Sequence, residues 1–157
     1  YEKLDIESLT KLLELKPNDP YYNELKAQFL LETGNPNEAI KYYNRALELE
    51  PNELLFNVGL SRALNSIGKY KSTIKILKNI YDKDPRNGRL LRELAIAYSQ
   101  NGELGWASLL TAERYALYGK FNDALIHAKR AQSILVPGTI AWLKVEDLIL
   151  EIESINK

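Results

Sequence analysis

The chain has 157 residues, and its 21 lysines and arginines balance 21 aspartates and glutamates, so the formal net charge is zero. Nucleic-acid interfaces and polybasic membrane-binding surfaces both need a clustered basic surplus, and the charge balance argues against either. The absence of cysteine and the presence of one histidine exclude disulfide frameworks, thiol nucleophiles and clusters of His and Cys around a metal. No apolar run approaches the ~18 residues that a membrane span needs.

The chain begins at Tyr1 and contains no methionine. Its first seventeen residues carry charges throughout and lack the apolar segment of a signal peptide. We therefore interpret the sequence as a piece of a longer protein, in which a targeting signal or a catalytic domain would lie upstream.

Residues that break helices recur along the chain with a period of 34. The two interleaved series are Pro17, Pro51 and Pro85, and Gly34, Gly68 and Gly102. Glycine favours the left-handed position just past a helix end, and proline cannot continue a helix. A breaker every 17 residues leaves room for one helix and one tight turn.

Apolar residues between the breakers follow a helical spacing, and strand signals with alternating polarity are absent. Asp19-Pro20, Asn35-Pro36 and Asp84-Pro85 each suggest a helix start with a capping residue before proline. The pattern predicts an all-α fold of about nine antiparallel helices: 2–15, 19–33, 36–49, 52–66, 69–82, 86–100, 103–118, 121–134 and 138–156.

Small residues keep the same period of 34 within the expected helices. They are Ala27, Ser61 and Ala95 on the first helix of each pair, and Ala39, Thr73 and Ala107 on the second. Small side chains let two helices approach closely. This pattern resembles the tetratricopeptide repeat (TPR), which is a helical hairpin of 34 residues that stacks into a solenoid. The matching residues are Ala27, Gly34, Ala39, Tyr43, Ala46 and Pro51 in one repeat, and Ser61, Gly68, Tyr70 and Pro85 in the next.

The alternation of proline and glycine reverses after Gly102, because Gly119 stands where proline is expected and Pro137 where glycine is expected. We therefore expect a phase change at 103–119, where one helix serves two repeats and the solenoid bends. As one solenoid domain over 1–157, the chain divides into a remnant second helix of a truncated repeat (1–17), three repeats (18–51, 52–85 and 86–119), an overlapping shifted repeat (103–137) and a capping helix with a polar outer face (138–157).

Three stretches resemble a narrower group, the C-terminal TPR region of bacterial HExxH zinc metallopeptidases such as the β-barrel assembly-enhancing protease of the periplasm. They run from Pro20 to Ile40, from Leu90 to Ala124 and from Ala128 to Ile149. The resemblance implies a periplasmic location and an upstream protease domain. The HExxH motif is absent here, and we interpret the lone His127 as a residue of the surface or of a groove edge.

The TPR resemblance also places one face of each first helix on a concave groove. The candidate binding residues are Tyr21, Glu24, Gln28, Leu31, Leu55, Val58, Arg62, Asn65, Arg89, Arg92, Ile96 and Ser99. Arg62, Arg89 and Arg92 would form a basic spot that suits carboxylates. Alternatively, these arginines pair with acidic neighbours such as Glu93 or face water.

We expect a protein-interaction scaffold that is not itself an enzyme and that has no catalytic, cofactor or metal residues. By resemblance it would engage outer-membrane-protein clients or their assembly machinery, as part of a periplasmic metallopeptidase. The alternative is a freestanding TPR adaptor, in the cytoplasm for example, that binds a short peptide in its groove. In either case the expected partner is a protein or peptide rather than nucleic acid, and no span of the membrane is expected.

Overall fold

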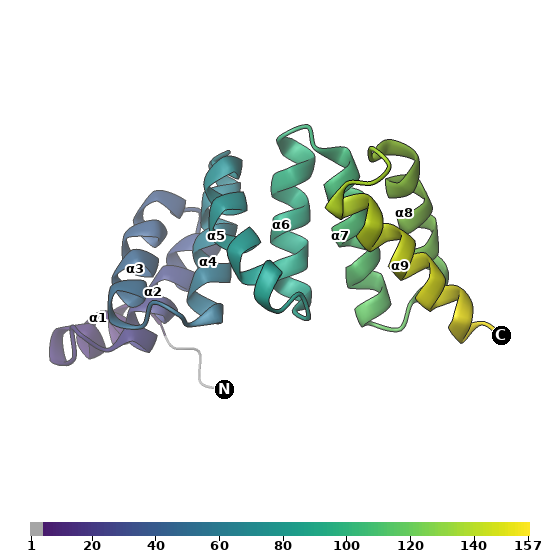
Figure 1. The fold of residues 1–157 in the computed structure, drawn as a ribbon. Helices are drawn as coiled ribbons and strands as arrows, with labels where there is room; N and C mark the ends of the chain where they lie inside the picture. Colours follow the sequence, from purple (N-terminus) through teal and green to yellow (C-terminus); the bar gives the residue numbers. More distant parts are fainter. Residues whose placement is uncertain (1–4) are drawn as a thin grey trace. The chain divides into compact units, whose positions relative to one another are not determined.

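The computed structural model describes residues 5–157, which form nine α-helices and no strand (Figure 1). The helices are α1 (Ile6–Leu15), α2 (Pro20–Glu32), α3 (Pro36–Leu49), α4 (Leu54–Ser66), α5 (Tyr70–Lys83), α6 (Gly88–Gln100), α7 (Leu104–Leu117), α8 (Phe121–Ile134) and α9 (Ile140–Ile155). The prediction of an all-α, TPR-type helical solenoid is confirmed. The expected start of the first helix, at residue 2, lies outside the described residues.

The periodic glycines end helices as the spacing predicts. Gly34 follows α2 with a φ of +83°, a backbone conformation that residues with a Cβ rarely adopt. The N–H of Gly34 donates to the carbonyl of Leu31, and the N–H of Asn35 donates to that of Leu30, at 3.2 and 2.8 Å. These are the two hydrogen bonds of a Schellman motif, which satisfies carbonyls at the helix end.

One of the three expected proline-linked helix starts is wrong. Asp19 does cap α2, because its Oδ1 accepts from the N–H of Tyr21 and of Tyr22. Asn35 precedes α3 as predicted, although its side chain makes no capping hydrogen bond. Asp84, in contrast, binds the backbone and side chain of Arg86, and α6 begins only at Gly88, capped by Asn87.

The helices group into two compact units, α1–α4 and α5–α9, with the boundary between Lys69 and Tyr70. In the first unit α2 packs on both α1 and α3, and α3 packs on α4. Ala27, Ala39 and Ala46 are fully buried, as expected for residues at close helix contacts. Gly59 of α4 lies directly against the ring of the buried Tyr43.

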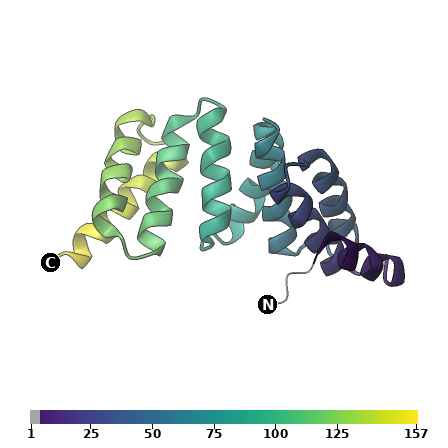
Figure 2. The ribbon, with the colours of Figure 1, turned by 180° about the vertical axis from the view of Figure 1, so that it is seen from behind.

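In the second unit α7 is the central helix, because it packs on α6, α8 and α9. One core cluster joins α7, α8 and α9: Leu109, Ala112, Ala128, Ala131, Ala141, Val145 and Ile149. Figures 1 and 2, which view the chain from opposite sides, show α9 running obliquely across the α7–α8 pair. Of the small residues with the period of 34, Ser61, Thr73 and Ala107 are buried, whereas Ala95 is half-buried.

α7 ends in the same way as α2, the first helix of the repeat at 18–51. The N–H of Gly119 donates to the carbonyl of Ala116 and that of Lys120 to Tyr115, the same pair of bonds that ends α2. At the end of α1, just before Pro17, the N–H of Lys16 donates to the carbonyl of Leu12. The N–H of Glu50 donates in the same way to the carbonyl of Ala46 at the end of α3. These bonds concern the helix ends alone, and the shifted repeat at 103–137, the remnant at 1–17 and the bend stay predictions.

The outer face of α9 is polar only in part. Val145, Ile149 and Ile152 are buried. Asp147, Glu151 and Ser154 are exposed, but Leu143 and Leu150 are 50% and 65% exposed as well, so the polar outer face that the sequence predicts also carries apolar side chains. The two leucines lie seven residues apart, about two helical turns, and therefore share one outward face with the exposed Asp147.

Candidate functional site

Most of the candidate groove residues are exposed, one is half-buried and three are buried. The exposed ones are Tyr21, Gln28, Leu55, Arg62, Arg89, Arg92, Ile96 and Ser99, and Leu31 is half-buried. Glu24, Val58 and Asn65 are buried, with 6%, 7% and 8% of their surface exposed. The prediction that these three line an open groove is therefore wrong.

Glu24 is buried because its side chain lies on the inner side of α2. Burial of the ring, and then the negative charge of Glu24, raise the pKa of Tyr43, a core residue of α3. Desolvation in turn raises the pKa of Glu24. The repeat position that predicted an exposed Glu24 turns inward here.

The candidate residues lie in two separate units. Those from Tyr21 to Asn65 belong to α2 and α4 of the first unit, and those from Arg89 to Ser99 belong to α6 of the second. The expected basic spot of Arg62 with Arg89 and Arg92 stays a prediction.

The structure does bring Ile96 and Ser99 together in a pocket of about 440 Å³, which we call the α6–α8 pocket. Its lining comes from three helices of the second unit: Ala95, Ile96, Ser99, Gln100, Leu104, Ala107, Ser108, Thr111, His127, Arg130 and Ile134. Arg89 and Arg92 lie on the same face of α6 as Ile96, two turns and one turn earlier, respectively. This pocket is the part of the predicted groove that the second unit forms by itself.

Apolar rim residues make the α6–α8 pocket suitable for apolar side chains. Ile96, Leu104 and Ile134 are 36%, 53% and 47% exposed, which is unusual for such large side chains in one place. Arg130 adds a charge, and the described residues that line the pocket include no carboxylate. The surface therefore offers apolar contacts beside a cation.

His127 contributes an aromatic wall rather than a charge at neutral pH. Its ring stacks on Tyr115 with a centroid distance of 5.3 Å and an interplanar angle of 15°. Burial, and then the nearby Arg130, lower the pKa of His127 from its usual value. The interpretation of His127 as a groove-edge residue agrees with its place in the pocket lining.

Arg130, Ile134 and Leu104 line the pocket although the sequence did not point to them as binding residues. The prediction assigned the groove to first helices alone, whereas α8 supplies three of the lining side chains. A usable signal was present, because His127, Arg130 and Ile134 follow the spacing of one helical face.

Over residues 5–157 no group of three or more metal-ligating side chains comes together. Within the same residues, none of the helices combines the length and the apolar character of a transmembrane segment.

Comparisons with known proteins agree with this architecture. The tetratricopeptide repeat family matches residues 20–53. The small glutamine-rich tetratricopeptide repeat-containing protein 2 of Mycosarcoma maydis is 30% identical over 95 residues, which is 60% of this chain and 27% of that protein. The chain thus spans about a quarter of the length of this curated relative.

Solved structures extend the fold likeness to nearly the whole chain. A crystal structure of MamA superposes with a TM-score of 0.69 at 18% identity, covering 96% of this chain and 88% of that one. PilW, a type IV pilus biogenesis factor, superposes with a TM-score of 0.59 at 20% identity, covering 89% and 73%. The chain therefore contains a tetratricopeptide repeat and has the tetratricopeptide-repeat fold.

Proposed function

We propose that this chain is a protein-binding scaffold that holds a partner segment in the α6–α8 pocket. TPR arrays are typical interaction modules, and the observation that carries the proposal is the exposed apolar rim beside Arg130. Apolar side chains of a partner would cover Ile96, Leu104 and Ile134, and a carboxylate would meet the guanidinium of Arg130.

We further propose that the scaffold is the C-terminal interaction region of a periplasmic zinc metallopeptidase. The support is the resemblance of three stretches of the chain to that group. In this role the pocket would position outer-membrane-protein clients, or their assembly machinery, for the protease domain of the same protein.

A photo-crosslinking amino acid at Ser99 tests both parts of this proposal. A matched control carries the same amino acid at Lys129, which is exposed on α8 but does not line the pocket. Each protein is incubated with denatured outer-membrane proteins and, separately, with a cytoplasmic extract. Crosslinks to outer-membrane proteins from Ser99 alone support the proposal, and Arg130→Glu should reduce them.

Equal crosslinking from Ser99 and Lys129 would contradict binding in the pocket. The upstream coding sequence supplies the other test, since the metallopeptidase assignment requires an HExxH motif there.

A second candidate is a freestanding adaptor that binds a short peptide. It is favoured by the curated relative, whose name describes a glutamine-rich TPR protein and no protease. Crosslinks from Ser99 to the cytoplasmic extract alone, together with an upstream sequence that lacks HExxH, would favour this adaptor.

A further inference from the structure

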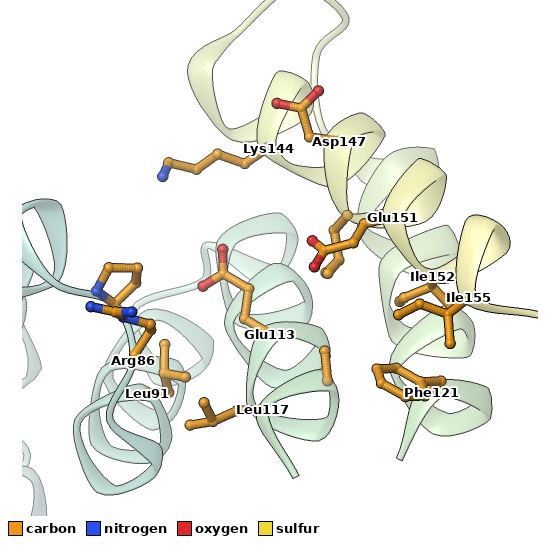
Figure 3. Close-up of a pocket in the computed structure, with 13 residues that line it drawn as sticks. Arg86, Leu91, Glu113, Leu117, Phe121, Lys144, Asp147, Glu151, Ile152 and Ile155 are labelled. Carbon is orange, nitrogen blue, oxygen red and sulfur yellow. The ribbon is translucent and has the colours of Figure 1, made fainter. Parts of the chain in front are cut away.

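A second pocket of about 420 Å³ lies on a different set of side chains in the same unit. It is enclosed by α9, the second half of α7 and the first residues of α6 and α8 (Figure 3). Leu117 and Ile155 line it while remaining 41% and 52% exposed, and Phe121 and Ile152 lie beside them. We call this site the α9 pocket.

The carboxylates of the α9 pocket outnumber its cations. Glu113, Asp147 and Glu151 line it together with Arg86 and Lys144. Both cations are engaged within the chain. Arg86 Nε lies 3.1 Å from Asp84 Oδ1, and Lys144 Nζ lies 5.1 Å from the centre of the Tyr81 ring, where its charge also acts to lower the pKa of Glu113. Among the described residues, the ion pairs do not include Asp147 or Glu151.

Glu113 directs the remaining negative charge into the pocket. Its carboxylate points into the space between Arg86 and Glu151, below Lys144 (Figure 3). One oxygen, Oε1, accepts a hydrogen bond of 2.8 Å from the hydroxyl of Tyr81. The other, Oε2, is enclosed and has no hydrogen-bond partner. An enclosed acceptor without a partner is unfavourable, and a cation at the mouth of the pocket would stabilise the charge of this carboxylate without contacting Oε2.

We propose that the α9 pocket docks a segment of a partner protein in which a lysine or arginine is flanked by aliphatic side chains. The cation pairs with Glu151 at the α7–α9 side and is attracted by the charge of Glu113, whose enclosed Oε2 it does not contact. The aliphatic neighbours cover Leu117, Phe121 and Ile155. This site differs from the α6–α8 pocket in both charge and helices, so one scaffold can hold two partner segments of opposite polarity.

The probe is a labelled amphipathic helical peptide of leucine and lysine, about 18 residues long, so that it spans roughly five turns. Its control replaces every lysine by glutamate. Binding to the full chain is followed by fluorescence anisotropy at low salt, where charge pairs contribute most. We expect saturable binding of the lysine peptide and at least tenfold weaker binding of the glutamate peptide.

Two variants on one helix separate the pocket from general charge attraction. Glu151→Lys changes a pocket carboxylate, and Glu153→Lys makes the same change at an exposed position of α9 that does not line the pocket. We expect Glu151→Lys to weaken binding about tenfold or more and Glu153→Lys to change it less than about twofold. Equal losses would overturn the proposal.

Glu113→Gln gives a test that preserves the shape of the pocket. Glutamine can still accept from the Tyr81 hydroxyl but carries no charge, and we expect binding to weaken about three- to tenfold with an unchanged circular-dichroism spectrum. No change in affinity would overturn the attraction by the charge of Glu113. Arg130→Glu should leave this binding intact, which makes failure here distinguishable from failure of the proposed function.

The occupant could instead be a second copy of the chain. Sedimentation of the unliganded protein over a concentration series decides this. A monomer supports the proposal, whereas a dimer that Glu151→Lys dissociates would overturn it.

Discussion

The α2–α3 hairpin of the first unit and the α7–α9 segment of the second use the same helix ends in different surroundings. α2 ends at Gly34 and α7 ends at Gly119, each in a Schellman motif. A proline follows the next helix in both segments, Pro51 after α3 and Pro137 after α8. α3 buries one stripe, Ala39, Tyr43 and Ala46. α7 instead packs on three helices and buries six residues, from Gly105 to Ala112, over more than one face.

This difference shows that a helix end is specified locally, whereas the number of faces a helix buries depends on its neighbours. The α2–α3 hairpin lies within the residues that match the TPR family. In the α7–α9 segment the repeat pattern changes phase, and there both pockets of the second unit include side chains of α7. Irregularity in the repeat therefore coincides with the candidate binding surfaces.

The largest expected effect comes from removing an end of the chain. α9 buries Ala141, Val145, Ile149 and Ile152 against the core of α7 and α8. Truncation after Pro137 exposes that core. We expect the truncated chain to aggregate and to lose cooperative unfolding. Size-exclusion chromatography and thermal melting measure these two effects.

Removing α1 is the matched comparison, since α1 buries only Leu9 among its described residues. A chain that begins at Asn18 should stay soluble and unfold cooperatively, with a lower melting temperature. If the two truncations behave alike, the contrast between the two units is wrong.

Overpacking comes next in size. Ala39 is fully buried in α3, so Ala39→Leu should destabilise by roughly 1–3 kcal/mol, because the added atoms have no space. Ala95 is half-buried and lines the α6–α8 pocket, where a larger side chain can extend into solvent. We therefore expect Ala95→Leu to cost less than about 1 kcal/mol, which is less than the same change costs at Ala39. Urea titration of both variants measures the difference.

Two glycines inside helices provide a finer comparison. A Cβ on Gly59 would lie 2.7 Å from Cζ of Tyr43, a ring that is only 2% exposed and has no room to move. A Cβ on Gly105 would lie 2.8 Å from Cγ of Leu135. The side chain of Leu135 is half-buried and can change rotamer.

Alanine gains roughly 0.5–1 kcal/mol over glycine in a helix interior. We expect Gly59→Ala to destabilise by about 1–2 kcal/mol despite this gain, and Gly105→Ala to lie within about 0.5 kcal/mol of the parent. A Gly59→Ala chain as stable as the parent would show that α3 and α4 can separate at little cost.

The sequence predicted the helices well because their ends depend on local chemistry. Gly34 and Pro51 act through their own backbone conformations, and the period of 34 made each end visible more than once. Asp84 misled the prediction because an aspartate before proline can cap a helix or bind a nearby arginine, and the sequence does not show which.

The candidate site was less predictable because it depends on which way a helix face turns. Glu24 and Gln28 share the predicted concave face, yet the structure buries the first and exposes the second. The α9 pocket combines Arg86, Glu113 and Glu151 from separate segments, and no spacing in the chain relates them. Such a site needs the packing of α9 on α7, which the repeat pattern does not define.

The smallest expected effect concerns one buried carboxyl in each unit, Glu24 and Glu113. Burial raises the pKa of both. At Glu113 the hydrogen bond from Tyr81, and then the charge of Lys144, act in the opposite direction and favour the ionised form. At Glu24 burial acts without such an opposing contribution.

The sign of the pH dependence follows from these shifts. Between the ordinary pKa and the raised one, the folded chain binds more protons than the unfolded chain, so stability falls as pH rises through this interval. Glutamine removes the cost of ionisation. We expect Glu24→Gln and Glu113→Gln to raise the melting temperature at pH 7, and both gains to vanish below the ordinary pKa of glutamate. A gain that persists unchanged in acid would show that the effect comes from packing rather than from charge.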